Sequence, residues 1–266
     1  MGVEPIRQPT PQARSESLTS ANRSGLTVVG VGPGDPELIT VAAQRAIAAA
    51  TVVAYPVAAL DRLGMAAQIA QPWLAPTQKR LPLLFPMVQE AEPRQQAWQQ
   101  AARAVAAEVT AGERVVFLCE GDCSLFASSS YLLLALKAEA PELAVRVIPG
   151  ITAASATAAA ARWPLALQGG QLQVVPLPDE PDQARQLLIA ARDQGQPMVL
   201  LKVGRRWRWL RPLLEELELL ESALYGERVG WPDQLLSPAA AIAAGERPYF
   251  SLVLLRPAWP AVLPWG

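Results

Sequence analysis

Short apolar runs alternate along this chain with longer segments in which apolar residues recur every three or four positions. The short runs are rich in Val, Leu and Ile and predict buried β-strands, whereas the longer segments predict amphipathic helices. The expected strands cover 26–29, 51–55, 115–119, 145–148, 172–175, 198–201, 223–229 and 249–255. The expected helices cover 41–50, 93–110, 125–139, 152–162, 182–193, 207–220 and 238–244. Regular alternation of strand and helix predicts an α/β fold.

The alternation is absent or interrupted in two places. Residues 1–24 are rich in Pro, Ser, Thr, Gln and Arg without apolar periodicity, which predicts a flexible tail. Trp163-Pro164 and Gly169-Gly170 enclose a second interruption. We therefore expect an N-terminal α/β domain over 25–168 and a C-terminal α/β domain over 169–266. Proteins built from two such domains usually hold their ligand in the cleft between them.

Composition narrows the classes of protein to consider. The chain has 266 residues, of which 51% are hydrophobic and 18% charged, so it can fill a sizeable core. The net charge of −1 gives no field that attracts nucleic acid or an anionic membrane. The longest apolar runs are broken by Thr, Ser or Pro, which is atypical of a membrane span. No basic region followed by an apolar core opens the sequence, so we expect no signal peptide and a cytoplasmic location.

The chain contains no histidine. This excludes Ser-His-Asp hydrolysis, Cys-His proteolysis and the common zinc sites, so no protein-bound metal is expected. The two cysteines, Cys119 and Cys123, are interpreted as reduced thiols, one in a strand and one in a loop. Any chemistry must therefore use carboxylates, hydroxyls, backbone groups or a reactive cofactor.

A glycine-rich loop follows the first expected strand, with the sequence Gly30-Val31-Gly32-Pro33-Gly34-Asp35-Pro36. Glycine allows a sharp turn and lets a ligand approach the bare main chain. A strand followed by such a loop is typical of α/β domains that bind nucleotides or cofactors. A dinucleotide fingerprint needs its third glycine one position later and an acidic residue at the end of the next strand. That strand ends in Tyr55-Pro56, so the loop is expected to hold a different ligand.

Three further segments stand at the ends of expected strands, where open α/β sheets collect their ligands. They are residues 119–126, 148–155 and 200–205. The second passes through Gly150 into the start of a helix that Thr152 is expected to cap. The start of a helix offers unpaired N–H groups to a carboxylate or phosphate.

These four segments, in this order, resemble the tetrapyrrole (corrin/porphyrin) methylase family over residues 25–257. The family comprises S-adenosylmethionine-dependent enzymes with two α/β domains. Within it, the likeness is greatest to members that methylate the C-20 meso carbon of precorrin-2 or cobalt-factor II in cobalamin (corrin) biosynthesis. The residues that carry this likeness are 32–40, 53–56, 83–87 and 121–128. The sequence departs from the pattern at Cys123, where the family usually has Pro, and at Phe126, where Tyr is common.

The resemblance implies roles for particular residues. S-adenosylmethionine would lie in the cleft between the domains, in contact with Gly121, Asp122, Leu125, Thr152, Ala153, Val203 and Gly230. The tetrapyrrole would lie against Gly32, Pro33, Gly34 and Asp35. A homodimer is also implied, whereas neither nucleic acid nor a membrane is expected as a partner.

The implied reaction suits a chain without histidine. The sulfonium is already activated and the acceptor carbon is already nucleophilic, so the protein mainly aligns the reactants and excludes water. A base is needed only to collect a proton, and the candidates are Asp122, ranked first, Glu120 and Tyr55. Arginine suits the many carboxylates of the substrate. The candidates for that contact are Arg205 and Arg206, with Lys79, Arg80, Arg94 and Arg208 as further possibilities.

Four alternatives remain open on the sequence alone. The chain could methylate another ring position, or it could resemble a ribosomal-RNA ribose methyltransferase of related fold, against which the lack of a basic stripe argues. A nicotinamide-dependent oxidoreductase is disfavoured by the missing acidic residue after Tyr55. A binding module without catalysis is the fourth.

Overall fold

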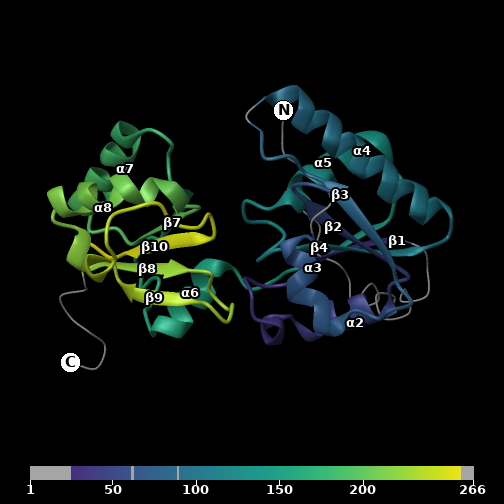
Figure 1. Ribbon diagram of the computed structural model, residues 1–266, viewed down its shortest axis with the longest axis horizontal. Coiled ribbons are helices and arrows are strands. Elements are labelled where there is room, and N and C mark those ends of the chain that lie inside the picture. The colour runs from purple at the N-terminus through teal and green to yellow at the C-terminus, as the bar shows by residue number, and fades with distance from the viewer. Residues whose placement is uncertain (1–24, 61–62, 89, 259–266) are drawn as a thin grey trace. The chain divides into compact units, whose positions relative to one another are not determined.

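The computed structural model describes residues 25–60, 63–88 and 90–258, which form two compact units (Figure 1). The first unit contains the described residues up to Val31 and from Pro36 to Gly150. The second contains Gly32–Asp35 and the described residues from Ile151 onward. Both units combine a sheet with helices, so the predicted α/β class is confirmed. The expected tail over 1–24 lies outside the described residues.

The first unit is built on a parallel five-stranded sheet in the order β3-β2-β4-β1-β5. Its strands are β1 (Gly25–Gly30), β2 (Val52–Val57), β3 (Lys79–Leu84), β4 (Arg114–Cys119) and β5 (Val145–Ile148). Its helices are α2 (Val41–Ala49), α3 (Met65–Ala70), α4 (Ala91–Thr110) and α5 (Ser128–Glu139). Figure 1 shows α4 and α5 on one face of this sheet and α2 and α3 on the other.

The strand order places a switch in chain direction between β1 and β4. The chain leaves β1 through α2 toward β2, whereas it leaves β4 through α5 toward β5 on the other side. The loops after these two neighbouring strands therefore diverge, and such a point is where open α/β sheets bind ligands. Buried side chains such as Val28 and Phe117 pack with Leu132 of α5 beneath it.

The second unit is built on a mixed five-stranded sheet in the order β6-β7-β10-β8-β9. Only β6 and β7 are parallel, and the other pairs are antiparallel. The strands are β6 (Gln173–Pro176), β7 (Met198–Leu201), β8 (Ala223–Glu227), β9 (Leu235–Pro238) and β10 (Ser251–Leu255). The helices are α6 (Ala153–Ala161), α7 (Pro181–Asp193) and α8 (Trp207–Glu216).

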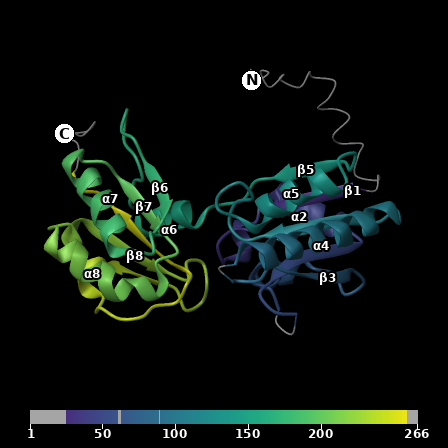
Figure 2. The ribbon, with the colours of Figure 1, turned by 90° about the horizontal axis from the view of Figure 1, so that it is seen from above.

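Helices cover both faces of this second sheet. Trp207 of α8 packs with Tyr225 and Val253 in the core that α7 and α8 share. The alanine-rich α6 packs with Leu224 and Leu254 on the opposite face. Figures 1 and 2 both show α7 and α8 together on one side of the sheet. Small side chains let α6 approach the sheet closely, which explains its run of alanines.

Several elements differ from the expectations. The helix expected over 238–244 is instead the end of strand β9 followed by a 3-10 turn, Ala239–Ala241. Strand β3 was not expected, and it tolerates Pro82 because it is an edge strand. The helix α3 was not expected.

The division into units also differs from the expected boundary at 168/169. The chain divides after Gly150, and α6 groups with the second unit because its apolar face packs on the second sheet. The loop Gly32–Asp35 groups with that unit as well. None of the helices in the described ranges is both long and apolar enough to cross a membrane.

Candidate functional site

Three strand ends of the first unit meet through glycine residues. A Cβ atom on Gly30 would lie 2.6 Å from the carbonyl oxygen of Gly121 and 2.6 Å from the nitrogen of Gly150. A Cβ atom on Gly150 would lie 2.2 Å from the same carbonyl oxygen. Real Cβ atoms do not approach other atoms closer than 3.0 Å. Only glycine therefore lets the backbones that follow β1, β4 and β5 touch at this edge of the sheet.

The carboxylate of Asp122 joins two of these loops. The Gly150 N–H donates to its Oδ2 atom at 2.9 Å, while the Ser124 N–H donates to Oδ1 at 2.8 Å. The Ser124 hydroxyl also donates to Oδ1. Partial burial by itself would raise the pKa of Asp122, but the hydrogen bonds from Ser124 and Gly150 outweigh burial and lower the pKa below its usual value. Both carboxylate oxygens are thus engaged, and a carboxylate of low pKa is a weak proton acceptor.

The other two candidate proton acceptors lie in different surroundings. Tyr55 is only 5% exposed, on β2. A Cβ atom on Gly64 would lie 3.0 Å from its ring, so the phenol is packed inside the unit. Glu120 directly follows β4 and is half-buried, as is Leu125. Phe126 is 45% exposed and has a positive φ of 51°.

The glycine loop contacts a segment nearly two hundred residues away. The Trp231 indole N–H donates to the Pro33 carbonyl oxygen at 3.1 Å. A Cβ atom on Gly34 would lie 2.6 Å from the Val229 carbonyl oxygen. A Cβ atom on Gly230, whose φ is +83°, would lie 2.6 Å from the nitrogen of Asp35. Gly34 and Gly230, assigned to substrate and cofactor by resemblance, are therefore packed backbone to backbone.

The turn after β7 is also unusual in conformation. Lys202 has a φ of 57° and Gly204 a φ of 53°, and Val203 between them is fully buried. The Val203 N–H donates to the Ser251 carbonyl oxygen at 3.0 Å. The Gly204 N–H donates to the Ser251 hydroxyl at 2.9 Å, and that hydroxyl donates to the Pro248 carbonyl oxygen at 2.8 Å. The start of β10 thus fixes the turn.

Arg206 holds the same turn from its other side. Its guanidinium donates to the carbonyl oxygens of Leu177 at 2.5 Å and Val203 at 3.3 Å, and also to that of Lys202. It forms an ion pair with Asp179 at 2.7 Å. This differs from the expected contact with substrate carboxylates, because acceptors of the protein itself occupy the guanidinium. The geometry makes Arg206 a positioning residue for the turn.

The remaining cationic candidates lie in three places. Lys79 and Arg80 begin β3, and in a parallel sheet the start of a strand lies at the edge opposite to its end. The structure therefore keeps them away from the glycine contacts, and their contact with substrate carboxylates stays a prediction. Arg205 and Arg208 are exposed, and each lies 3.8 Å from the carboxylate of Glu246. Arg94 lies in the first turn of α4 and donates to the Glu90 carbonyl oxygen at 3.2 Å.

Thr152 caps α6, as its position suggested. Its hydroxyl oxygen accepts a hydrogen bond from the Ser155 N–H at 3.0 Å, and Ala153 is the first residue of the helix. Capping by a threonine hydroxyl satisfies one of the free N–H groups at a helix start.

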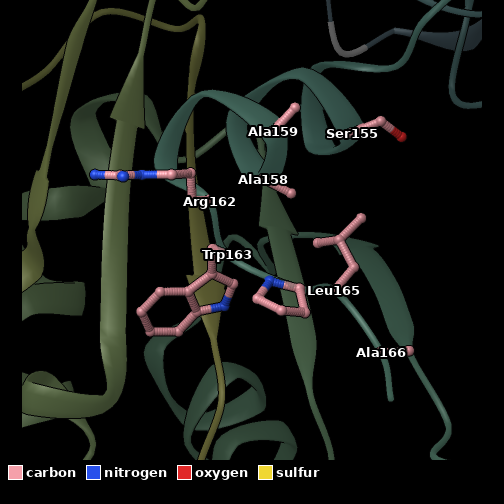
Figure 3. Close-up of a pocket in the computed structure, with 8 residues that line it drawn as sticks. Ser155, Ala158, Ala159, Arg162, Trp163, Leu165 and Ala166 are labelled. Carbon is pink, nitrogen blue, oxygen red and sulfur yellow. The ribbon is translucent and has the colours of Figure 1, made fainter. Parts of the chain in front are cut away.

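A pocket of about 420 Å³ lies along α6 from Ser155 onward (Figure 3). Its lining residues are Ser155, Ala158, Ala159, Arg162, Trp163, Pro164, Leu165 and Ala166. Figure 3 shows the Arg162 side chain extending away from Ala158 and Leu165. The pocket brings no converging polar groups to a ligand, so we assign it no role.

Sequence reasoning missed three side chains that shape these loops: Asp179, Trp231 and Ser251. A serine at the head of the apolar run 251–255 was the one usable signal, because a hydroxyl at the start of a buried strand usually has a partner. Asp179 and Trp231 gave no signal, since their partners are distant in the sequence.

The loops at the strand ends of the first unit present backbone groups, one engaged carboxylate and closely packed glycines. No group of three or more Cys, Asp or Glu residues is placed to hold a metal ion within the described residues. Backbone groups and an engaged carboxylate are suited to orienting a ligand and offer little acid–base chemistry. They suit a reaction whose reactants bring their own reactivity.

The two sheets, each covered by helices, define an α/β protein of two units. The family of Tetrapyrrole (Corrin/Porphyrin) Methylases matches residues 25–241. The chain belongs to this family, as the four segments indicated.

The chain is similar to two relatives of known name and to one solved structure. It is 36% identical over 240 residues to a precorrin-2 C(20)-methyltransferase of Sinorhizobium sp, covering 87% of this chain and 94% of the relative. It is 30% identical over 236 residues to a cobalt-precorrin-2 C(20)-methyltransferase of Salmonella typhimurium, covering 88% and 97%. The fold is similar to that of uroporphyrin-III C-methyl transferase from Thermus thermophilus, solved with S-adenyl homocysteine. That match has a TM-score of 0.59 and 25% identity, covering 87% of this chain and 92% of the other.

Proposed function

We propose that this protein transfers the methyl group of S-adenosylmethionine to the C-20 meso carbon of precorrin-2 or cobalt-factor II in cobalamin biosynthesis. The observation that carries the proposal is the 36% identity to a precorrin-2 C(20)-methyltransferase over 94% of that relative's length. Similarity along nearly the whole of both chains leaves little room for an unrelated activity.

The residues present fit the proposed cofactor. The ionised Asp122 carboxylate is a favourable neighbour for a sulfonium cation, because opposite charges attract most strongly where water is partly excluded. The N–H groups at the start of α6, beside Thr152 and Ala153, suit the carboxylate of the methionine moiety. The close packing of Gly30 and Gly150 on the Gly121 carbonyl oxygen fixes the loops that would line the cofactor site. When bound, the sulfonium supplies an activated methyl group.

The chain itself would mainly hold and orient the reactants. Asp122 keeps the loops after β4 and β5 together through Gly150, and Arg206 keeps the buried turn at Val203 in its conformation. For the proton released after transfer we propose Glu120 as acceptor, because it is half-buried directly after β4, whereas the pKa of Asp122 is lowered and Tyr55 is packed inside. Glu120 directly follows β4, at the same edge of the sheet as the glycine contacts.

Recognition of the tetrapyrrole is assigned to two sets of residues. The loop Gly32–Asp35 would face the macrocycle. Arg205 and Arg208 are the candidates for its carboxylates, because their exposed pairs with Glu246 at 3.8 Å are weak enough to yield to a better partner. A homodimer and a cytoplasmic location complete the proposal, and light scattering on the purified protein tests the former.

The direct test incubates the protein with isotopically labelled S-adenosylmethionine and either metal-free precorrin-2 or cobalt-factor II. Mass spectrometry and NMR of the product should show one new methyl group on the C-20 meso carbon. The acceptor that turns over faster identifies the metal content of the substrate. A new methyl group on an exterior pyrrole carbon, with none at C-20, would overturn the assigned position.

A thermal-shift assay tests the cofactor independently of the acceptor. S-adenosylhomocysteine should raise the melting temperature in proportion to its affinity, whereas NAD should not. A rise in melting temperature with NAD but not with S-adenosylhomocysteine would instead support a nicotinamide-dependent oxidoreductase.

A further inference from the structure

Two cysteine residues enclose the turn that carries Gly121 and Asp122. Cys119 is the last residue of β4 and Cys123 directly follows Asp122, and each is only 2% exposed. Both are free thiols in the structure. Neither has a role in the proposed methyl transfer, and position 123 is one of the two at which the sequence departs from the family pattern.

Contacts from neighbouring groups hold the two residues together. The Ser129 hydroxyl lies 3.3 Å from the Cys119 Sγ atom and 2.7 Å from the Cys123 carbonyl oxygen, so one side chain contacts both residues. The Cys123 sulfur lies 3.4 Å from the Ile148 carbonyl oxygen, and both cysteines belong to the same buried cluster. Ser129 and this cluster therefore hold the two thiols in one buried region of the unit.

The surroundings of the two thiols shift their pKa values in opposite directions. The hydrogen bond from Cys123, aided by those from Ser129, lowers the pKa of the Cys119 thiol, although burial opposes this effect. The same contact, together with burial, raises the pKa of the Cys123 thiol. Cys119 thus has the greater thiolate character, and the thiolate is the form that attacks an oxidant. A nucleophilic thiolate next to a second thiol is the arrangement that favours a disulfide after oxidation.

We propose that Cys119 and Cys123 are a modification site, at which a hydroperoxide produces a reversible disulfide that distorts the Gly121–Asp122 turn. The Cys119 thiolate attacks one peroxide oxygen, the O–O bond breaks, and the sulfur becomes a sulfenic acid while the other oxygen leaves as hydroxide. The Cys123 sulfur then attacks the Cys119 sulfur, forms the S–S bond and releases water. Overall, two thiols lose two hydrogens and one hydrogen peroxide becomes two waters.

The surrounding backbone explains why this bond would matter. A disulfide brings its sulfur atoms to about 2.05 Å, much closer than a hydrogen-bonded pair of thiols. The turn between them cannot absorb the movement, because the Gly121 carbonyl oxygen is packed against Gly30 and Gly150. The hydrogen bond from the Gly150 N–H to Asp122 would then be strained or lost. We therefore expect weaker cofactor binding in the oxidised protein, and this consequence rests on the proposed function.

The test treats the reduced full-length protein with hydrogen peroxide and follows two readouts. Mass spectrometry under denaturing conditions should show a loss of two hydrogens and protection of both cysteines from alkylation. Affinity for S-adenosylhomocysteine, measured by calorimetry, should fall at least tenfold, and dithiothreitol should restore both. Because the sulfurs are buried, a bulky aromatic disulfide reagent should react with the native protein much more slowly than peroxide.

Three variants serve as controls. Cys123→Ser keeps a small donor at the position, so it should bind S-adenosylhomocysteine with unchanged affinity before peroxide treatment. Since it cannot form the bond, that affinity should not fall through disulfide formation, and a sulfenic-acid probe should label Cys119. Cys123→Ala gives a second test should the serine variant fold poorly. Ser129→Ala removes the group that contacts both residues and should slow formation of the disulfide.

The outcomes separate the two claims. Oxidation to sulfinic acid without a disulfide, or no reaction, overturns the modification site whatever the activity. A disulfide that leaves the affinity unchanged overturns its effect on the turn. A reduced protein that never binds S-adenosylhomocysteine contradicts the proposed function instead, and the mass readout still decides whether the bond forms.

Discussion

The loops after β1, β4 and β5 and the turn after β7 are both held in unusual conformations, but by opposite means. In the first, Gly30, Gly121 and Gly150 let backbone touch backbone because they carry no side chain. In the second, the side chains of Arg206 and Ser251 reach in from outside and bind the peptide groups of the turn. The same requirement, a fixed backbone at the end of a strand, is thus met by removing side chains in one unit and by adding them in the other.

The two solutions differ in how they fail. A glycine packed against backbone does not tolerate substitution, because a single added carbon atom must displace the backbone on both sides. A turn held by several hydrogen bonds loses them one at a time, and each typically contributes about 1 kcal/mol, or somewhat more where a charge is involved. We therefore expect an abrupt effect of substitution in the first unit and a graded effect in the second.

The largest effect is expected for Gly150→Ala. Its Cβ atom would lie 2.2 Å from the Gly121 carbonyl oxygen and 2.7 Å from the carbonyl carbon of Gly30. We expect a loss of more than about 3 kcal/mol in the free energy of unfolding, measured by chemical denaturation. The matched control is Gly169→Ala, where an added Cβ meets nothing within 4 Å. Equal stability of the two variants would show that the strand ends are not in the close contact described.

The difference between the two regions also explains what can be predicted from the sequence. A glycine that follows an apolar run can be recognised in a single sequence. The sequence alone therefore predicts that Gly30, Gly121 and Gly150 lie at the edge of the sheet where the strands end. The alanine run predicts the helix α6 but not its assignment to the second unit, because only packing against β10 decides it. Likewise, Pro82 conceals the edge strand β3, since proline usually argues against a strand.

The role of Arg206 was beyond sequence reasoning for a physical reason. An arginine beside a loop is equally suited to a substrate carboxylate and to the carbonyl oxygens of the protein. The choice depends on where Leu177 and Asp179 lie, and these belong to the segment after β6. Similarly, the sequence predicts Asp122 as a base but gives no sign of the hydrogen bonds from Ser124 and Gly150 to its carboxylate, and its role in proton transfer stays a prediction.

A graded effect is expected for Arg206→Ala. The change leaves the carbonyl oxygens of Leu177 and Lys202 without this donor, so the free energy of unfolding should fall by about 2 kcal/mol. In the methyl-transfer assay, KM for S-adenosylmethionine should rise more than kcat falls, because the turn is misplaced and no reacting group is removed.

Arg206→Lys and Arg205→Ala sharpen this test. Lysine keeps the charge but cannot span the same set of acceptors, so it should restore only part of the lost stability. Arg205 is exposed and its side chain lies 3.8 Å from Glu246, so its replacement should change stability by no more than about 0.5 kcal/mol. A lysine variant as stable as the native protein would mean that charge alone, rather than the array of hydrogen bonds, holds the turn.

The smallest and most specific effect is expected for the pH dependence of Asp122→Asn. Because the pKa of Asp122 is lowered in the folded protein, its carboxylate stabilises the fold above the unfolded-state pKa of about 3.9. That contribution disappears as the pH falls through the lower folded-state value. The asparagine variant has one acceptor oxygen for the two sets of donors, so it should be less stable by about 1 kcal/mol near neutral pH.

The gap in unfolding free energy between the two proteins should therefore narrow as the pH falls below the unfolded-state pKa and through the lower folded-state pKa, measured by denaturation at each pH. Glu139, Glu216 and Asp233 also have lowered pKa values through their arginine partners, but they are present in both proteins and cancel in the difference. A gap that stays constant with pH would mean that the charge of Asp122 contributes nothing to the contact with Gly150. A loss of kcat without any change in cofactor affinity or in this gap would restore Asp122 as the proton acceptor. In that case the first region would contain a catalytic carboxylate, Asp122, in addition to its packed glycine residues.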